Sequence, residues 1–285
     1  MRTFIRYIKK LVPLPIWNFF REIYLDVYFF FKDIGPYIRN RNYCGITLYY
    51  NRGNHLIQRL EREIVFEEKL CSSIVQNIEQ KGDPTVIDIG ANIGLISTYI
   101  LSKIPTVKIF AFEPGPVQVA MLKKTVEGNH LGDRVTIYSY ALGNNEGDVA
   151  FYTHKSRFIA YDGLLDTGRA KKPKKIDVRM TTLDSWWRSN NHPHVDAVKI
   201  DTEGAELLIL KGAEDFITSV KPTIFLEIEP RNIQVYPYTH MDILQWLNER
   251  NYSLATLDNK VIAQDNFAEF IAKEDTFVAR SISSR

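Results

Sequence analysis

Acidic residues gather in one short stretch, Ala197–Glu206, where they could transfer a proton. An apolar run leads to Asp201, and Glu203 follows directly before a glycine. Open α/β sheets bind ligands at the carboxyl ends of their strands. We therefore expect Asp201 and Glu203 to act as a general base or to hold an acceptor hydroxyl in line. Glu206 fits a structural role, because an acid in the first turn of a helix complements the helix dipole.

A second acidic strand end, Phe225–Pro230, is expected at the same edge. Glu227 and Glu229 alternate with apolar residues, so their side chains share one face. Asp201 together with Glu227 could hold Mg²⁺, which prefers oxygen ligands; the alternative is that these acids hydrogen-bond polar groups of a ligand. His240 follows the strand and is a candidate base because of its pKa, although a surface or capping role is the alternative.

A glycine-rich turn, Val86–Gly94, joins an apolar strand to a helix. Its glycines permit a tight turn, and the helix directs free N–H groups toward a ligand. A dinucleotide site would need a glycine where Asn92 stands, and no P-loop sequence occurs. S-adenosylmethionine has a ribose but no phosphate, and Asp88 could meet its amine. The candidate cofactor residues of this turn are Asp88, Gly90, Ala91, Asn92 and Gly94.

The next strand, Ile109–Pro114, ends in Glu113, about one βαβ unit after the glycine turn. An acid at this place can accept both ribose hydroxyls of a cofactor. The alternative is a helix-capping or surface acid. Pro114 and Ala141, at the ends of the second and third strands, complete the predicted cofactor-binding set.

Apolar strands alternate with helices along most of the chain, which predicts a doubly wound, mostly parallel α/β sheet covered on both faces. The expected strands include Lys108–Glu113, Val135–Leu142, Val195–Asp201 and Thr223–Glu229. Residues 147–187 interrupt this alternation and are expected to insert a hairpin or flap over the ligand end. Within them, the basic run from Arg169 to Lys175 is a solvated loop or a clamp for an anionic substrate.

The remaining segments are assigned by composition and periodicity. Residues 1–43 form a basic, aromatic, amphipathic helical extension, which packs on the body or a second subunit, or lies on an anionic membrane surface through residues 1–31. Residues 44–285 form the main domain, with a cap over 44–82 and a catalytic core over 83–285. In the cap we expect a strand over Cys44–Tyr50 and a helix over Leu56–Ile78. Its acids Glu63, Glu67 and Glu68 form a solvated face, or one of them reaches the amine of a ligand.

The 285 residues carry a net charge of +2, and 45% are hydrophobic, which suffices for a sizeable core. Residues 1–41 hold eight Lys and Arg against three Asp and Glu, or +5, which leaves −3 for the rest. Nucleic acid is therefore not an expected partner. Two lone cysteines make neither a disulfide framework nor a zinc site. We expect a cytoplasmic protein with no transmembrane helix or signal peptide, with attachment at the inner membrane face as the alternative.

These pieces together resemble the FkbM family of S-adenosylmethionine-dependent methyltransferases. The resemblance covers about residues 45–230 and rests on Val86–Ser97, Ala111–Pro114, Thr182–Asp184, Lys199–Glu206, Leu210–Ala213 and Leu226–Glu227. It implies a class I methyltransferase fold and O-methylation, typically of hydroxyls on sugars or secondary metabolites. It also implies that Asp88, Gly90, Asn92, Gly94 and Glu113 bind the cofactor, with Asp201 and Glu203 at the substrate edge. The family often has asparagines after the second helix, where this chain has Thr125–His130.

Two other functions remain as alternatives. An NAD-dependent oxidoreductase would share the strand–turn–helix, although Asn92 argues against it. A non-catalytic, membrane-associated binding module would keep the fold without the reaction. We expect the acceptor to be a small molecule, a glycan or a glycolipid.

Overall fold

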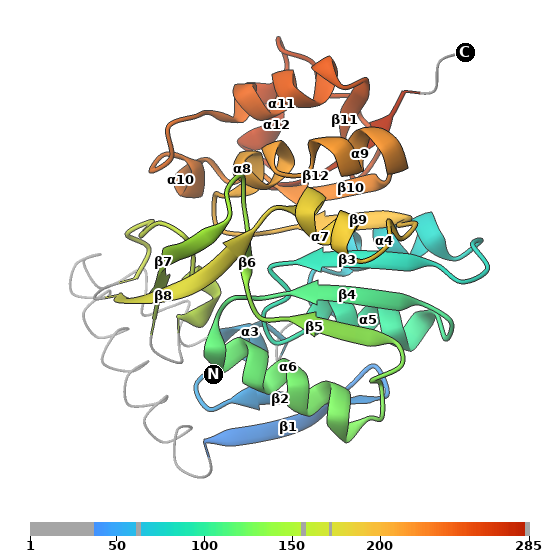
Figure 1. The fold of residues 1–285 in the computed structure, drawn as a ribbon, viewed down its shortest axis with the longest axis vertical. Coiled ribbons are helices and arrows are strands. Elements are labelled where there is room, and N and C mark those ends of the chain that lie inside the picture. The colour runs from blue at the N-terminus through green and yellow to red at the C-terminus, as the bar shows by residue number, and fades with distance from the viewer. Residues whose placement is uncertain (1–36, 61–63, 155–157, 171–172, 283–285) are drawn as a thin grey trace, which may run out of the picture.

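The computed structural model describes residues 37–60, 64–154, 158–170 and 173–282. A seven-stranded sheet lies at its centre, in the order β11-β12-β10-β9-β3-β4-β5 (Figure 1). All neighbours from β10 to β5 pair in parallel, whereas β12 is antiparallel to both of its neighbours. The mostly parallel sheet is therefore confirmed. The strands are β3 (Thr85–Ile89), β4 (Lys108–Phe112), β5 (Val135–Tyr138), β9 (Ala197–Ile200), β10 (Thr223–Glu227), β11 (Tyr252–Thr256) and β12 (Thr276–Ser281).

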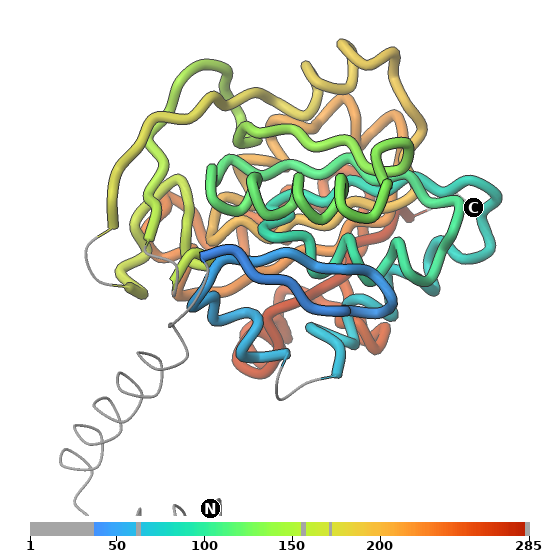
Figure 2. The backbone as a smooth tube through the Cα atoms, turned by 90° about the horizontal axis from the view of Figure 1, so that it is seen from below, coloured from blue at the N-terminus to red at the C-terminus, as the bar shows by residue number. Residues whose placement is uncertain are grey.

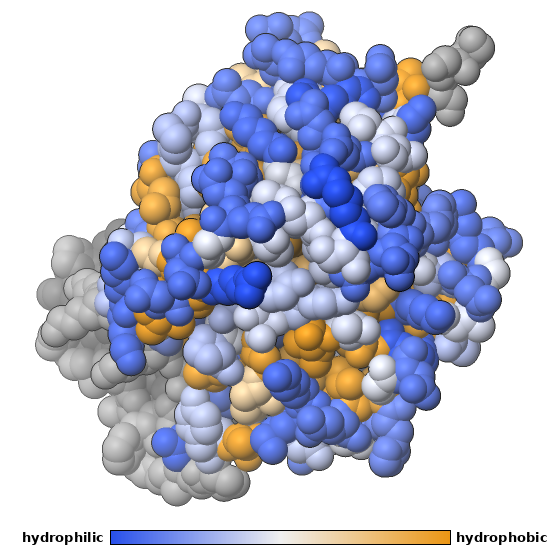
Figure 3. Space-filling view, in the orientation of Figure 1, coloured by the Kyte–Doolittle hydropathy of each residue, from blue (hydrophilic) through white to orange (hydrophobic). Residues whose placement is uncertain are grey.

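Helices cover both faces of this sheet because successive strand residues, whose side chains point to opposite faces, are apolar. On β3, Val86 packs into one hydrophobic core, while Ile87 and Ile89 pack into another. The first core includes residues of α4 (Glu68–Ile78), α5 (Leu95–Lys103) and α6 (Pro116–Gly128). The second includes residues of α7 (Leu183–Ser189), α8 (Glu206–Lys211), α9 (Glu214–Val220), α10 (Pro230–Ile233), α11 (His240–Glu249) and α12 (Phe267–Ile271). Hydrophilic residues accordingly predominate on the face seen in Figure 3.

A three-stranded sheet stands at the end of the central sheet where β3 and β4 finish (Figure 1). It consists of β6 (Ala141–Leu142), β7 (Gly147–Thr153) and β8 (Lys174–Thr181), in the order β6-β8-β7. Strands β7 and β8 pair antiparallel, so the expected hairpin is present, with a short 3₁₀ turn, Ile159–Tyr161, in its loop. The prediction of a single strand over Val135–Leu142 was wrong, because β5 ends at Tyr138 and β6 pairs with β8 in the smaller sheet.

The segment before the central sheet also differs from expectation. A hairpin, β1 (Ile38–Tyr43) and β2 (Ile46–Asn51), replaces the single strand over Cys44–Tyr50. Cys44 and Gly45 have φ angles of 53° and 85°, which a two-residue hairpin turn of type I′ requires. The expected helix over Leu56–Ile78 is two helices, α3 (His55–Leu60) and α4. Glu67, just before α4, has a left-handed φ of 46°, so the helical path breaks there.

The hairpin of β1 and β2 is fixed to α6 by hydrogen bonds. Tyr49 N donates to Thr125 Oγ1 at 3.0 Å, and Thr47 N donates to Asn129 Oδ1 at 2.9 Å. Figure 2 shows this hairpin, in blue, running alongside α6, in green. Thr125 and Asn129, in the segment where the chain departs from the family, therefore hold the hairpin. The helical extension expected over residues 1–43 lies outside the described residues up to residue 36, and its last part was wrong, because Ile38–Tyr43 form strand β1. None of the described helices is long and apolar enough to cross a membrane.

Candidate active site

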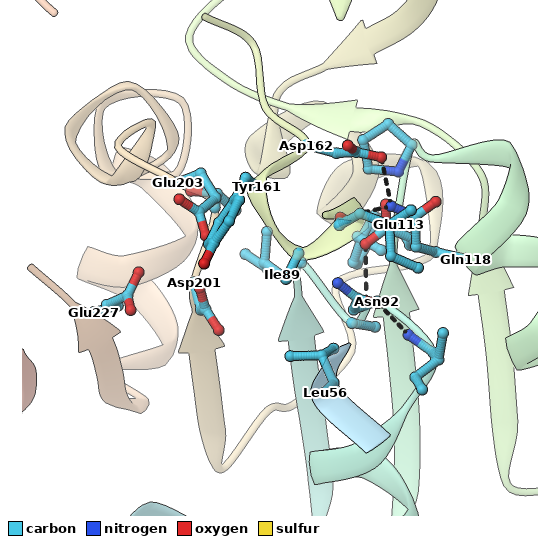
Figure 4. A pocket seen from close by; sticks show the side chains of 18 of the residues that line it. Leu56, Ile89, Asn92, Glu113, Gln118, Tyr161, Asp162, Asp201, Glu203 and Glu227 are labelled. Atoms are coloured by element: carbon cyan, nitrogen blue, oxygen red, sulfur yellow. Dashed lines mark hydrogen bonds between the residues drawn. The ribbon is translucent and has the colours of Figure 1, made fainter. Parts of the chain in front are cut away.

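A cavity of about 320 Å³ opens at the carboxyl ends of β3, β4, β9 and β10. The glycine turn after β3, helix α3 and the hairpin loop 159–169 form its walls. Figure 4 shows acidic side chains at two separate ends, with Ile89 and Tyr161 between them. One end contains Glu113, and the other contains Asp201 and Glu227 (Figure 4). The cavity can therefore hold one ligand with two distinct parts, or two ligands in contact.

The two glycines of the glycine turn, Gly90 and Gly94, permit different close contacts. Gly90 has a φ of 74°, and a Cβ there would lie 1.8 Å from the Asp201 carbonyl oxygen. Gly94 has a φ of 85° and faces Leu122 of α6, with a Cβ placed 2.5 Å from that side chain. Gly90, Ala91 and Asn92 line the cavity, whereas Gly94 is not among its lining residues. Gly90 thus permits contact with the acidic edge, and Gly94 permits helix packing.

Glu113 is held by backbone N–H groups on both sides. Asn92 N donates to its Oε2 at 2.9 Å, and Gly115 N donates to its Oε1 at 2.7 Å. Burial raises the pKa of Glu113 to about 7, although these two bonds oppose the rise. Each carboxyl oxygen can accept a second hydrogen bond. The arrangement suits a ligand that presents two neighbouring hydroxyls.

Gln118 lies beside Glu113 in the cavity wall (Figure 4). Its Nε2 donates to Asp162 Oδ2 at 2.7 Å and to the Ile159 carbonyl at 3.0 Å. Its Oε1 is buried and has no hydrogen-bond partner among the described residues. A buried acceptor of this kind is costly unless a ligand donates to it. Pro114 and Ala141, both predicted to bind the cofactor, also line the cavity.

The acidic end brings Asp201, Glu203 and Glu227 together, as the sequence predicted. Burial raises the pKa of Glu203 to about 8 and raises that of Glu227 well above its usual value, and the charge of Asp201 adds to both shifts. Glu203 also has a left-handed φ of 55°, which is uncommon for a residue with a side chain. Glu67, expected on a solvated face or within reach of a ligand amine, lines the cavity, and burial raises its pKa to about 7. This end favours groups that donate hydrogen bonds.

For Arg169, in the basic run expected to be a solvated loop or a clamp for an anionic substrate, the solvated loop was wrong. Its Nη1 donates to Glu203 Oε2 at 2.9 Å and to Asn232 Oδ1 at 3.1 Å. Its guanidinium carbon lies 4.2 Å from the centre of the Tyr161 ring. Tyr161 and Arg169 both line the cavity, so the hairpin loop supplies part of its wall. The sequence singled out the basic run that contains Arg169, but it gave no signal for Tyr161 or for the pairing of Arg169 with Glu203, which forms only through the tertiary fold.

Asp88 and Lys199 form a buried pair beneath the glycine turn. Lys199 Nζ lies 3.2 Å from Asp88 Oδ1, and Ser97 Oγ donates to Asp88 Oδ2 at 2.6 Å. Asp88 is not among the residues that line the cavity, although Lys199 is. No role was predicted for Lys199. A signal existed, because a lysine within a short apolar strand needs an acidic partner once it is buried.

The structure places three other candidates outside the cavity lining. His240 begins α11, and its ring packs edge-on against Phe267 with ring centres 5.0 Å apart; burial lowers its pKa. Glu229 caps α10 and pairs with Arg231 at 2.8 Å. Glu206 accepts backbone bonds through Oε1, for example from Gly204 N at 3.1 Å, as its structural interpretation predicted. Within the described ranges, no group of three or more His, Cys, Asp or Glu could hold a metal ion.

The central sheet is doubly wound and mostly parallel, and the cavity lies at the carboxyl ends of its strands. The chain belongs to the FkbM methyltransferase family, because the model of the Methyltransferase FkbM domain matches residues 88–254, more than half of the chain. It is therefore a methyltransferase. The suspected family membership, the fold class and the enzyme class are all confirmed.

Similar proteins carry related names. Methyltransferase sdnD of Sordaria araneosa is 24% identical over 246 residues, which cover 77% of this chain and 92% of sdnD. 2-O-methyltransferase NoeI of Sinorhizobium fredii is 25% identical over 166 residues, covering 54% of this chain and 66% of NoeI. Hexuronic acid methyltransferase AglP of Haloferax volcanii is 26% identical over 175 residues, which cover 60% of this chain and 68% of AglP. The solved structure of a putative caffeoyl-CoA O-methyltransferase from Staphylococcus aureus is 13% identical in sequence and has a TM-score of 0.48. The match covers 80% of this chain and 91% of that chain.

Proposed function

We propose that the protein transfers a methyl group from S-adenosylmethionine to a hydroxyl, with a sugar of a glycan or glycolipid as the acceptor class. One observation carries this proposal: a single cavity joins the Glu113 end to the acidic end around Asp201. The first end suits a ribose, and the second suits a hydroxyl that must lose a proton. A secondary metabolite with a similar hydroxyl is the other acceptor class that the resemblance implies.

The residues at the first end fit S-adenosylmethionine. Glu113 has capacity for two hydroxyls, Gln118 Oε1 lacks a partner among the described residues, and Asn92 occupies the place where pyrophosphate would need a glycine. Gly90, Ala91 and Pro114 would form the remaining wall around the cofactor. When bound, the cofactor would supply a methyl group on a positively charged sulfur, which is already electrophilic.

The acidic end would orient the acceptor and receive its proton. The Asp201 side chain is 32% exposed, against 11% for that of Glu203. Arg169 donates to Glu203 at 2.9 Å, whereas the Lys199 ammonium lies 3.4 Å from Asp201 Oδ2, so Asp201 is the better placed base. Holding the hydroxyl in line and removing its proton are the two contributions that a methyl transfer needs from the protein.

The sugar acceptor is supported by the names of two relatives. NoeI is named a 2-O-methyltransferase, and AglP is named for a hexuronic acid. Carboxylates that accept hydrogen bonds also suit a sugar, which presents several hydroxyl donors.

The test is a mass-spectrometric search for methylated product. The wild type, Asp201→Asn and an exposed control, Asp133→Asn, are each incubated with S-adenosylmethionine and extracts of glycans and glycolipids. We expect Asp201→Asn to lower turnover by about 10²-fold or more, the usual contribution of general acid–base catalysis, and the control to match the wild type. A cofactor-binding protein that methylates no hydroxyl in any extract would contradict the proposal.

A further inference from the structure

Lys199 is a cation buried in the middle of the central sheet. It is 3% exposed and lies on β9 directly opposite Asp88 of β3. The two side chains point to the same sheet face as Val86 and Ala197, toward the core beneath α4. A buried ammonium is costly unless charges and hydrogen bonds compensate for it. Its position therefore needs an explanation in terms of its partners.

The Lys199 ammonium contacts both halves of the site. Its Nζ donates to the Gly90 carbonyl at 2.8 Å and to the Ile89 carbonyl at 3.3 Å, both in the glycine turn. The same Nζ lies 3.4 Å from Asp201 Oδ2, at the acidic end. One group thus binds the backbone of the predicted cofactor turn and the side chain of the predicted base.

These two turns also touch directly. The space for a Cβ at Gly90 is occupied by the Asp201 carbonyl, 1.8 Å away, and Asp201 N donates to the Ile89 carbonyl at 3.2 Å. A displacement of either turn must therefore move the other, because close-packed atoms leave no space for independent motion. Lys199 lies where the two turns meet.

The charge of Lys199 suits this place. Burial lowers its pKa, but the charges of Asp88 and Asp201 outweigh that effect and hold the pKa above its usual value. The same region contains Glu67 and Glu227, whose pKa values are raised first by burial and then by the negative charge of Asp201. An ammonium next to Asp201 offsets this concentration of acids.

We propose that Lys199 is a positioning residue that ties the glycine turn to Asp201, so that cofactor affinity and acceptor orientation depend on one buried ammonium. This inference rests on the proposed methyl transfer. It goes beyond it by making Lys199 act on both ends of the cavity, through Gly90 on one side and Asp201 on the other.

The first test uses Lys199→Gln, with Arg134→Gln as the control. Arg134 is a partly buried cation that also holds backbone carbonyls, those of Leu101 and Ile104, but it does not line the cavity. Calorimetric titration with S-adenosylmethionine should show the Kd rising about tenfold or more in Lys199→Gln, the loss expected for a charged hydrogen bond, and staying unchanged in the control. Asp201→Asn should leave the Kd close to that of the wild type.

The second test is a double-mutant cycle on kcat. If Lys199 acts through Asp201, then Asp201→Asn should lower kcat less in the Lys199→Gln background than in the wild type. Should Lys199→Gln alone fail to fold, the pair Asp88→Asn with Lys199→Gln replaces both buried charges by amides and avoids an uncompensated carboxylate. That pair should still show the weakened cofactor affinity.

Two results would overturn the inference. A folded Lys199→Gln protein with wild-type Kd and kcat would show that Lys199 has a structural role only. Fully additive effects of Lys199→Gln and Asp201→Asn on kcat would show the same. Failure of the wild type itself to bind S-adenosylmethionine would instead reject the proposed function, and with it this inference.

Discussion

Glu113 combines a structural role and a proposed binding role in one carboxyl group. The sequence left open whether it caps a helix or accepts ribose hydroxyls. In the structure, its Oε1 accepts from Gly115 N at the start of α6, and its Oε2 accepts from Asn92 N. It also lines the cavity. Because carboxyl oxygens have two lone pairs each, the backbone bonds fix the group and leave capacity for a ligand.

Buried acids at this site should make folding stability depend on pH. Burial raises the pKa of Glu206 to about 7 in the folded state. The unfolded chain loses this proton near pH 4.5, the usual Glu value, so the folded state binds more protons between these two values. Stability contributed by the protonated group is therefore lost as pH rises through this window.

Glu206→Gln should remove this part of the pH dependence while keeping an oxygen acceptor for Gly204 N. We expect its Tm, relative to the wild type, to increase from about pH 5 to about pH 8, as measured by calorimetry in a pH series. The exposed control Glu127→Gln should show a constant difference. A constant difference for Glu206→Gln as well would contradict the raised pKa.

The glycine turn and the turn after β9 form one packed unit at the element scale. Gly90→Ala should abolish cofactor binding, because the new Cβ would meet the Asp201 carbonyl at 1.8 Å and φ is 74°. Gly132→Ala is the matched control, since a Cβ at Gly132 meets nothing within 4 Å. Thermal unfolding and ligand titration of both variants measure the effect. Equal behaviour of the two variants would show that the contact at Gly90 is not required.

The hairpin loop contributes Arg169 to the acceptor side of the cavity. Arg169→Gln should raise the acceptor KM several-fold by loosening Glu203, about the effect of losing one charged hydrogen bond, with little change in cofactor Kd. Lys175→Gln, an exposed change in the same basic run, should leave both constants unchanged. Steady-state kinetics at varied acceptor concentration measures this KM. A loss of cofactor affinity with an unchanged acceptor KM would show that Arg169 acts on the cofactor end of the cavity instead.

Residues adjacent to a strand end could be predicted from the sequence. Gly90, Glu113 and Asp201 each follow an apolar run, so the alternation of strands and helices was enough to bring them to one edge. The basic run that begins at Arg169 was placed in a flap over the ligand end, but its partner Glu203 was beyond such reasoning, because it is reached only through the packing of the inserted hairpin. Lys199 was predictable in principle, since its apolar neighbours imply burial and the strand register places Asp88 opposite.

Element boundaries were predicted less well, for a related reason. Apolar patterning does not show where a chain leaves one sheet for another, so β5 and β6 were merged into one strand. The break before α4 depends on the left-handed conformation of Glu67, a residue whose type does not suggest it. A turn formed by residue types that rarely adopt a left-handed conformation is therefore hard to locate from the sequence.

The molecule as a whole places the proposed cofactor and acceptor residues on different elements that meet at one cavity. Strands β3 and β4 supply the first end, β9 and β10 supply the acidic end, and α3 with the hairpin loop closes the sides. A ligand bound at one end would stabilise the entire fold by mass action, provided that the unfolded chain does not bind it. The central claim is therefore testable on the intact protein without knowing the acceptor.

The most direct measurement is a calorimetric titration of the wild type and Glu113→Gln with S-adenosylmethionine, and with NAD as a comparison ligand. We predict that the wild type binds S-adenosylmethionine but not NAD. Glu113→Gln should weaken that binding by about tenfold or more, because a charged acceptor for the ribose hydroxyls is lost. Absence of S-adenosylmethionine binding, or equal affinity in the two proteins, would contradict the account.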